Sequence, residues 1–292
     1  MDAGAVHAVR REVIGMPDKR RIALVTGASS GLGREFARLL AREAVDELWL
    51  VARRGARLRE LSAELAVPCR IFALDLTQEA ALEELSAALS AEPPVVRYLV
   101  NAAGFGRIGM AADIGAATTG RMIALNCRAA AELTERALPY MERGSRVLEI
   151  ASCAAFQPIP YLAAYAATKA FLLRYSRALA AEVAARGITV TAICPYWIRD
   201  TEFIHEAKKT DRRGLFRGFP LATDQKTVAR RSLWAAAHGF TVFTPDLVST
   251  LHRIVTSILP HRLMIALSNL WVSAKSPGVS IDCFDSSPFH RR

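Results

Sequence analysis

The sequence predicts an α/β protein in which a mostly parallel sheet is covered by helices on both faces, a doubly wound arrangement. Short apolar segments rich in β-branched residues alternate along the chain with longer segments whose apolar residues recur at helical spacing. The short segments are almost continuously apolar, which is typical of strands buried on both faces. With 292 residues, 52% of them hydrophobic and 23% charged, the chain is long enough for one α/β domain of about 250 residues.

Seven short segments are predicted to be strands. In chain order they are residues 21–26, 47–52, 68–74, 97–100, 145–151, 188–194 and 241–243. Helices are predicted between them, beginning with residues 32–43, where Phe36, Leu39 and Leu40 show helical spacing. The next helix runs through Leu58 and Leu65, and the later ones are predicted at residues 79–90, 119–143, 163–186 and 223–237.

A single domain, residues 21–245, is predicted to hold these elements, because the chain shows no internal repeat or low-complexity linker. After Pro195 the alternation stops, and residues 196–222 are predicted to be an irregular segment rich in aromatic and basic residues. A C-terminal extension, residues 246–275, contains two amphipathic pieces, 246–259 and 262–272. An N-terminal extension, 1–20, and a flexible tail, 276–292, complete the predicted organisation.

Composition narrows the functional class. No apolar run reaches the ~18 to 20 residues of a membrane-spanning helix, and residues 1–20 lack the compact apolar stretch of a secretory signal. The five cysteines are scattered without metal-ligand spacing, which favours a reducing, cytoplasmic location and no metal site. The net charge is +10, yet the arginines form no basic block, so an anionic cofactor, acidic substrate or membrane surface is favoured over a nucleic acid.

A glycine-rich turn joins the first predicted strand to the first helix. Residues 26–33 read TGASSGLG, in which Gly27 and Gly31 permit a tight turn and Gly33 permits close packing of helix on strand. The helix N-terminus would offer free N–H groups to a pyrophosphate, although a plain glycine turn has the same composition. The predicted cofactor contacts here are Gly27, Ser29, Ser30, Gly31, Leu32 and Gly33.

The TGxxxGxG spacing resembles that of the short-chain dehydrogenase/reductase family, and further motifs agree with it in order over residues 21–245. The resemblance implies a Rossmann-like fold, an oxidoreductase that uses NAD(P), and a homo-oligomer. It also implies cofactor contacts from Asp75 and Leu76, from the NAAG segment through Asn101, Ala102 and Gly104, and from Pro195, Ile198 and Thr201. The segment PYWIRDT, residues 195–201, departs from the family's commoner Pro-Gly-x-Val-x-Thr.

The end of the second predicted strand favours NADPH over NADH. Enzymes that prefer NAD commonly carry Asp or Glu about 20 residues after the glycines, where this chain has Arg53 and Arg54. Guanidinium groups suit a 2′-phosphate, although two arginines capping a strand are the alternative interpretation.

Tyr165 and Lys169 are the predicted reacting pair. They are four residues apart on one helix face, and an ammonium near a phenol is expected to lower the phenol pKa from its ordinary value of about 10. The family resemblance adds Ser152, which would orient the substrate oxygen, and Asn126, which would hold a water linking Lys169 to solvent. It also implies that Lys169 bonds the nicotinamide ribose.

These motifs predict an alcohol dehydrogenase or ketone reductase acting on a hydrophobic substrate. The segment after Pro195 offers an apolar lining through Phe203, Ile204, Leu215, Phe216 and Phe219. A steroid-like or long-chain ketone is one candidate, a 3-oxoacyl thioester another, and a non-catalytic dinucleotide-sensing protein the alternative class. The C-terminal amphipathic pieces could cover the pocket, pack in a subunit interface or lie on a membrane surface, and packing is favoured.

Overall fold

A computed structural model describes residues 19–199, 201–212, 214 and 221–275. Its centre is a seven-stranded sheet with the strand order β3-β2-β1-β4-β5-β6-β7, and every neighbouring pair is parallel. The strands are β1 Arg21–Thr26, β2 Glu47–Val51, β3 Cys69–Phe72, β4 Val95–Asn101, β5 Arg146–Ile150, β6 Thr189–Ile193 and β7 Val242–Phe243. The predicted doubly wound, Rossmann-like sheet is therefore confirmed, and its strand order reverses between β1 and β4.

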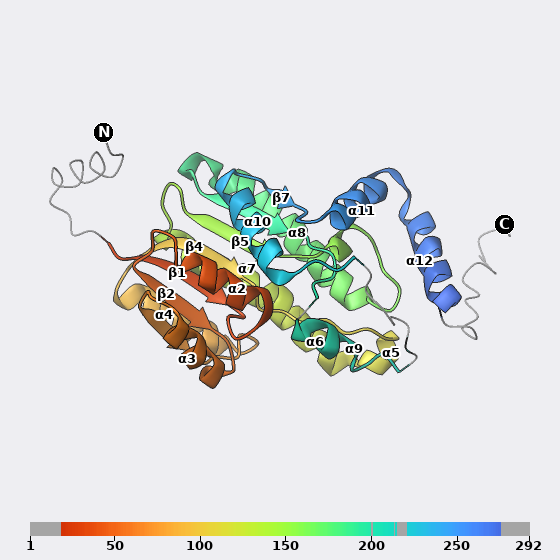
Figure 1. Ribbon diagram of the computed structural model, residues 1–292, viewed down its shortest axis with the longest axis horizontal. Coiled ribbons are helices and arrows are strands. Elements are labelled where there is room, and N and C mark those ends of the chain that lie inside the picture. The colour runs from red at the N-terminus through yellow and green to blue at the C-terminus, as the bar shows by residue number, and fades with distance from the viewer. Residues whose placement is uncertain (1–18, 200, 213, 215–220, 276–292) are drawn as a thin grey trace, which may run out of the picture.

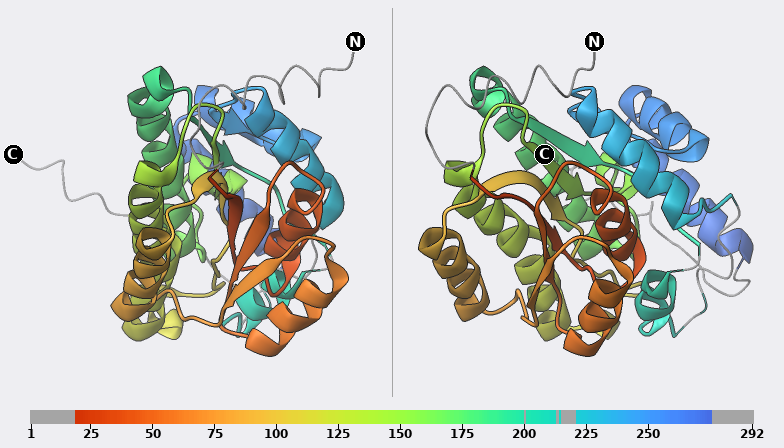
Figure 2. Two further views of the ribbon diagram at one scale, coloured as in Figure 1. Left: turned by 90° about the vertical axis from the view of Figure 1, so that its left-hand side faces the viewer. Right: turned by 60° about the vertical axis from the view of Figure 1, so that its left-hand side comes forward.

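Helices cover both faces of this sheet, as Figures 1 and 2 show. One layer contains α4 (Glu79–Ala91), α7 (Ala130–Ala137) and α8 (Ala163–Val183), and the other contains α2 (Gly31–Leu40), α3 (Gly55–Glu64) and α10 (Gln225–Ala237). Shorter helices surround the carboxyl ends of the strands: α5 (Ala111–Ile114), α6 (Ala116–Ile123) and α9 (Glu202–Lys208). The chain then continues into α11 (Leu247–Ile258) and α12 (His261–Lys275) at one end of the molecule.

The packing of β1 explains why its sequence is continuously apolar. Ile22 and Leu24 pack in the core cluster that includes α4, α7 and α8, whereas Ala23 and Val25 pack in the cluster that includes α2, α3 and α10. All four side chains are fully buried. Successive strand residues point to opposite faces, so a strand between two helical layers needs an apolar residue at every position.

Two predicted segments differ from the structure. The single helix predicted over residues 119–143 is broken into α6, a π-helical turn at Ala124–Ala129, α7 and a 3₁₀ turn at Leu138–Tyr140. The segment 196–222, predicted to be irregular, contains α9. This helix forms where Ala207 is fully buried and its carbonyl accepts a hydrogen bond from the Ile108 N–H, a long-range contact that periodicity does not reveal.

Candidate active site

A cavity of about 930 Å³ lies at the carboxyl ends of the central strands, where the strand order reverses. Its walls come from the glycine turn after β1, the residues that follow β2, β4, β5 and β6, and side chains of α8, α9, α11 and α12. Ligands of open parallel sheets bind at this edge, because there the loops after adjacent strands separate. One cavity thus contains nearly all the residues that the sequence analysis selected.

The glycine turn is as tight as its composition predicts. Gly27 and Gly31 have φ angles of +68° and +56°, a region that favours glycine, and a Cβ on Gly27 would lie 2.9 Å from the Ala102 backbone. A Cβ on Gly33 would overlap the carbonyl oxygen of Gly27. No side chain caps the first turn of α2, which leaves its N–H groups for an anion. The cradle therefore fits a dinucleotide pyrophosphate.

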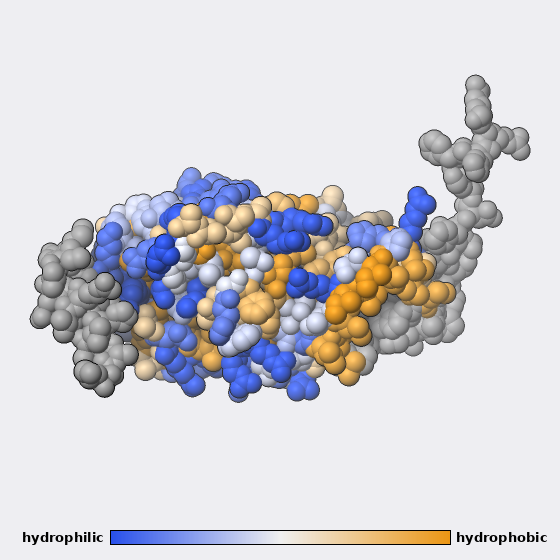
Figure 3. Space-filling view, turned by 90° about the horizontal axis from the view of Figure 1, so that it is seen from above, coloured by the Kyte–Doolittle hydropathy of each residue, from blue (hydrophilic) through white to orange (hydrophobic). Residues whose placement is uncertain are grey.

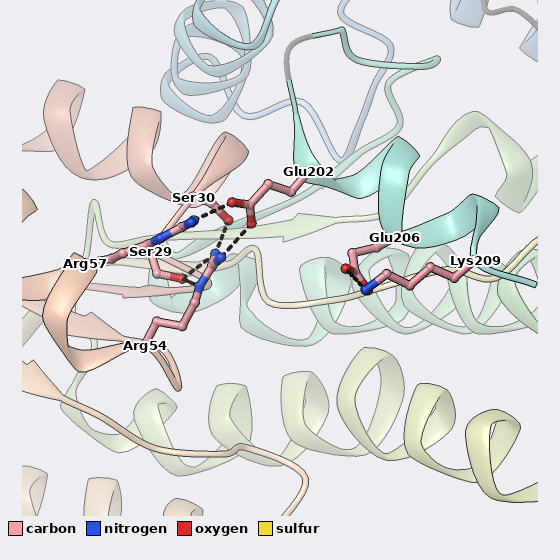
Figure 4. A network of polar contacts seen from close by, with 7 residues as sticks. All are labelled: Ser29, Ser30, Arg54, Arg57, Glu202, Glu206 and Lys209. Atoms are coloured by element: carbon pink, nitrogen blue, oxygen red, sulfur yellow. Dashed lines mark hydrogen bonds and ion pairs between the residues drawn. The ribbon is translucent and has the colours of Figure 1, made fainter.

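Arg54 reaches from the end of β2 across the glycine turn (Figure 4). Its guanidinium donates to Ser29 Oγ at 3.1 and 3.2 Å, to Ser30 Oγ at 2.8 Å and to Glu202 Oε2 at 2.7 Å. Arg57 pairs with the other oxygen of Glu202, and this hydrogen bond is the main cause that lowers the pKa of the Glu202 carboxyl. Arg53 and Arg54 both line the cavity. The sequence analysis missed Arg57 and Glu202. The available signal for Arg57 was its position three residues after Arg54, at the start of a helix, whereas no local signal marks Glu202.

The structure brings Ser152, Tyr165 and Lys169 together in the wall of the same cavity. Ser152 follows β5, and its Oγ accepts a hydrogen bond of 3.2 Å from the Ala154 N–H. Tyr165 and Lys169 share one face of α8, are 8% and 5% exposed, and lie with Lys169 Nζ 5.8 Å from the phenol ring centroid. Lys169 Nζ donates a hydrogen bond of 2.6 Å to the Ile150 carbonyl, which fixes the ammonium beside the end of β5.

The expected pKa of Tyr165 needs correction. We predicted that Lys169 would lower it, but burial raises the pKa of Tyr165 well above its ordinary value, and a hydrogen bond from Ser152 offsets this only in part. Burial also lowers the pKa of Lys169 to about 8. Both effects arise because the two groups are buried, which penalises the phenolate and the ammonium alike. Tyr165 is therefore protonated at neutral pH, the state that a proton donor requires.

Two predicted site residues, Asn101 and Asn126, lie behind the cavity wall and do not line it. Asn126 Oδ1 accepts from the Phe105 N–H at 3.1 Å, and Nδ2 donates to the Phe105 carbonyl at 2.9 Å and to Thr168 Oγ1 at 3.1 Å. These hydrogen bonds tie the loop after β4 to α8. The amide also lies near Lys169, since a Cβ on Gly104 would be 3.0 Å from Asn126 Oδ1 and 3.5 Å from Lys169 Nζ. The predicted water link stays a prediction.

Most of the other predicted cofactor contacts do line the cavity. Asp75 lies in its wall, where Oδ1 accepts hydrogen bonds from the backbone and hydroxyl of Thr77 at 3.0 and 2.8 Å. The segment after β6 contributes an internal bond of 3.0 Å from Thr201 Oγ1 to the Ile198 carbonyl. The further predicted residues in the wall are Leu32, Leu76, Ala102, Gly104, Pro195, Ile198 and Thr201.

The part of the cavity wall supplied by α9, α11, α12 and the segment after β5 is called the substrate wall below. It is built partly from residues that the sequence analysis did not select. Phe203 lines the cavity as predicted, with its ring 5.5 Å from that of Tyr165, whereas Ile204 does not line it, and Leu215, Phe216 and Phe219 lie outside the described residues. Additional lining comes from α11, α12 and the segment after β5: Gln157, Ile159, Leu162, Val248, His252, Met264, Leu267 and Ser268. The amphipathic spacing of residues 246–272 was the available signal. Covering the pocket was one of three alternatives for this segment, and side chains of α11 and α12 do line the cavity.

Comparisons with known proteins agree with this geometry. A family model described as short chain dehydrogenase matches residues 21–212. This chain belongs to the short-chain dehydrogenase family. An uncharacterized oxidoreductase of Staphylococcus epidermidis is 30% identical over 179 residues, which are 61% of this chain and 77% of that protein. The probable oxidoreductase EphD of Mycobacterium tuberculosis is 35% identical over 182 residues, which are 59% of this chain but only 30% of EphD.

Several solved structures share the fold over most of the chain. A short-chain dehydrogenase from Sphingobium yanoikuyae in complex with NADPH has a TM-score of 0.68 and 27% identity, over 82% of this chain and 96% of that one. The bulky-bulky ketone specific alcohol dehydrogenase from Comamonas testosteroni has a TM-score of 0.66 and 26% identity, over 84% and 96%. A 3-ketoacyl-(acyl-carrier-protein) reductase from Brucella melitensis complexed with NADH has a TM-score of 0.65 and 26% identity, over 79% and 98%.

Beneath the candidate active site of this short-chain dehydrogenase, β5 carries a fully buried carboxyl group, Glu149. Its Oε1 accepts hydrogen bonds from Asn101 Nδ2 at 2.7 Å and Thr134 Oγ1 at 2.8 Å, while its Oε2 has no partner among the described residues. Burial raises the pKa of Glu149 from 4.5 to about 7, and the charge of Lys169 acts against this shift. Asn101 is thereby held on the buried side of β4 and anchors the strand that leads to the NAAG segment.

We predict that Glu149 makes the stability of this short-chain dehydrogenase fall as pH rises from 5 to 7. Well below pH 4.5 Glu149 is protonated in both the folded and the unfolded state, so it does not oppose folding. Between pH 4.5 and its folded pKa of about 7 the unfolded chain releases the proton while the folded state keeps it, and the free energy of unfolding therefore falls progressively. Lys169, with a pKa of about 8, stays charged through most of this window. Relative to Glu149→Gln, the wild-type protein should lose about 2 kcal/mol of unfolding free energy between pH 5 and 7 in urea titrations. Parallel pH curves for the two proteins would contradict the prediction.

Proposed function

We propose that this protein is an NADPH-dependent oxidoreductase that reduces the carbonyl group of a hydrophobic substrate or oxidises the matching alcohol. The observation that carries the proposal is the placement of Ser152, Tyr165 and Lys169 in the same cavity as the glycine turn and Arg54. A dinucleotide cradle alone would also fit a sensing protein. A buried phenol next to an amine of lowered pKa adds the parts that a proton transfer requires.

The chain's own residues can perform the acid–base half of this reaction. A bound nicotinamide cofactor supplies the hydride. The hydroxyl groups of Ser152 and Tyr165 bind the carbonyl oxygen, and Tyr165 donates a proton to it as the alcohol forms. The ammonium of Lys169 then donates a proton to the phenolate and restores the phenol, for which a pKa of about 8 is suitable because both protonation states of the amine are accessible near neutral pH. The buried surroundings of both groups exclude competing water.

Arg54 supports NADPH as the preferred cofactor. Its guanidinium lies beside Ser29 and Ser30 of the glycine turn, and no carboxylate follows β2 at residues 52–54. An arginine fork matches a phosphate, whereas an NAD ribose is commonly held by an acid. The structural neighbours include complexes with NADPH and with NADH, so the preference rests on this chain's own residues.

The substrate wall supports a bulky hydrophobic carbonyl compound, such as a steroid-like or long-chain ketone. Apolar side chains from four separate elements meet there, including Leu162, Phe203, Val248 and Met264. A 3-oxoacyl thioester is the second candidate, because Arg107, Arg121 and Lys209 also line the cavity and would suit the phosphates of an acyl carrier.

We further propose that the protein is cytoplasmic and forms a homo-oligomer. The four cysteines within the described residues are free thiols, which fits a reducing compartment. None of the helices in the described part of the chain is long and apolar enough to span a bilayer. The oligomeric state is proposed from the family alone.

The decisive experiment is a substrate screen with the full-length protein. Bulky aromatic ketones, steroid ketones, long-chain ketones and 3-oxoacyl thioesters should be assayed by the loss of NADPH absorbance, with NADH in parallel. We expect turnover with at least one class, and faster turnover with NADPH than with NADH at equal concentration. Tight NADPH binding without turnover in either direction, including with the matching alcohols and NADP⁺, would favour the dinucleotide-sensing alternative.

A further inference from the structure

The helices α11 and α12 each have an inner and an outer face. The inner faces contribute Val248, His252, Met264 and Ser268 to the wall of the cavity. The outer faces expose seven large apolar side chains: Leu247, Leu251, Ile254, Ile258, Leu263, Leu267 and Leu270. Leu247 is 82% exposed, Ile258 73% and Leu270 66%, so these side chains gain little from folding of the chain alone.

The exposed residues follow helical spacing and form continuous rows. On α11 they are separated by four, three and four residues, and on α12 by four and three residues, which places each set on one side of its helix. Hydrophobic residues gather at the end of the molecule that carries these helices (Figure 3). Single exposed leucines are common on soluble proteins, but a contiguous apolar patch marks an interaction surface.

The charges of this segment identify the chemistry of the partner. From Leu247 to Lys275 the sequence contains no Asp or Glu, whereas it contains Arg253, Arg262 and Lys275. Arg253 and Arg262 are both exposed, and Arg253 also donates a hydrogen bond of 3.3 Å to the Val242 carbonyl of β7. A helix with an apolar row and basic residues on its polar side is suited to the boundary between acyl chains and anionic headgroups.

A second copy of the chain fits this patch less well. A twofold dimer brings the same surface of both subunits together, so each α11–α12 patch would meet a patch that carries the same basic residues. Neither helix offers a carboxylate to pair with them. Like charges brought together across an apolar interface disfavour association, whereas an anionic bilayer neutralises them.

The same two helices form part of the cavity wall, so the outer apolar surface lies close to the candidate active site. Leu267 lines the cavity and is also 45% exposed on the outer row, so this side chain of α12 borders both the cavity and the outer apolar surface. We propose that α11 and α12 dock this protein on an anionic phospholipid bilayer and that its hydrophobic substrate enters the cavity from that bilayer. The docking step stands independently, whereas the entry step rests on the proposed function.

The test is flotation of the full-length protein with vesicles of phosphatidylcholine alone or of phosphatidylcholine with phosphatidylserine. We expect the protein to float with the anionic vesicles, less with the neutral ones, and less again at high salt. The double variant Leu251→Ser/Ile258→Ser removes two outer side chains that do not line the cavity, and it should lower the partition coefficient by about ten-fold or more. Arg262→Glu should weaken binding to anionic vesicles while leaving binding to neutral vesicles nearly unchanged.

Ile123→Ser is the matched control, because Ile123 is a half-exposed isoleucine on α6 and should not affect flotation. NADPH binding by each variant verifies folding, and turnover of a water-soluble ketone without vesicles tests the proposed function separately. Absence of wild-type flotation with anionic vesicles would overturn the proposal. So would equal flotation of the wild type and the double variant, or a dimer in light scattering that the double variant dissociates.

Discussion

Replacing Tyr165 with Phe is expected to abolish most turnover while leaving the fold and NADPH binding intact. The phenol is buried, its burial keeps it protonated, and it lies beside Ser152 and Lys169, so its hydroxyl is the group placed to donate the proton. Phenylalanine preserves the ring that packs against Phe203 at 5.5 Å. Loss of the general acid should lower kcat by roughly 10²- to 10⁴-fold, measured as NADPH oxidation with the best ketone from the screen.

Tyr175→Phe is the matched control for this variant. Tyr175 lies on the same helix, its hydroxyl donates to the Ala131 carbonyl at 3.3 Å, and it does not line the cavity. Its replacement should change kcat less than about two-fold, because the hydrogen bonds of this hydroxyl are remote from the reacting atoms. A Tyr165→Phe variant with turnover close to that of Tyr175→Phe would refute the assignment of the proton donor.

The parts of the fold that were predictable from sequence are those set by local patterns. The sheet was predictable because consecutive strand residues, such as Ile22 and Ala23, point to opposite faces of the sheet and are both apolar. The glycine turn and the pair Tyr165 and Lys169 were predictable because their spacing along the chain already determines their relative placement on a turn or a helix face. In each case the relevant neighbours are close in sequence.

The missed features depend on contacts between distant segments. Glu202 pairs with Arg54 and Arg57 across more than 140 residues, and no local pattern indicates such a pair. The π-helical turn that carries Asn126 places its amide against Phe105, a contact that an uninterrupted helical pattern conceals. The predicted pKa of Tyr165 was wrong because spacing gives the proximity of Lys169 but not the depth of burial, which dominates here.

Replacing Arg54 with Ala is expected to raise the KM for NADPH by about 10- to 100-fold and to change the KM for NADH much less. A hydrogen bond to a charged group contributes roughly 1.5–3 kcal/mol, and each 1.4 kcal/mol corresponds to about a ten-fold change in affinity. The 2′-phosphate that Arg54 would bind is absent from NADH, so the ratio of the two KM values reports on this contact. Initial rates with both cofactors at saturating ketone measure it.

NADH also controls for a structural role of Arg54, since the guanidinium holds Ser29 and Ser30 of the glycine turn. Equal weakening of NADPH binding and NADH binding would show that Arg54 orders the turn and does not bind the 2′-phosphate.

Replacing Glu202 with Gln is expected to have the opposite effect on NADPH binding, because the Glu202 carboxylate pairs with the guanidinium of Arg54 and repels a phosphate. This variant should bind NADPH several-fold more tightly at low salt while NADH affinity stays constant, and the gain should disappear in the Arg54→Ala background.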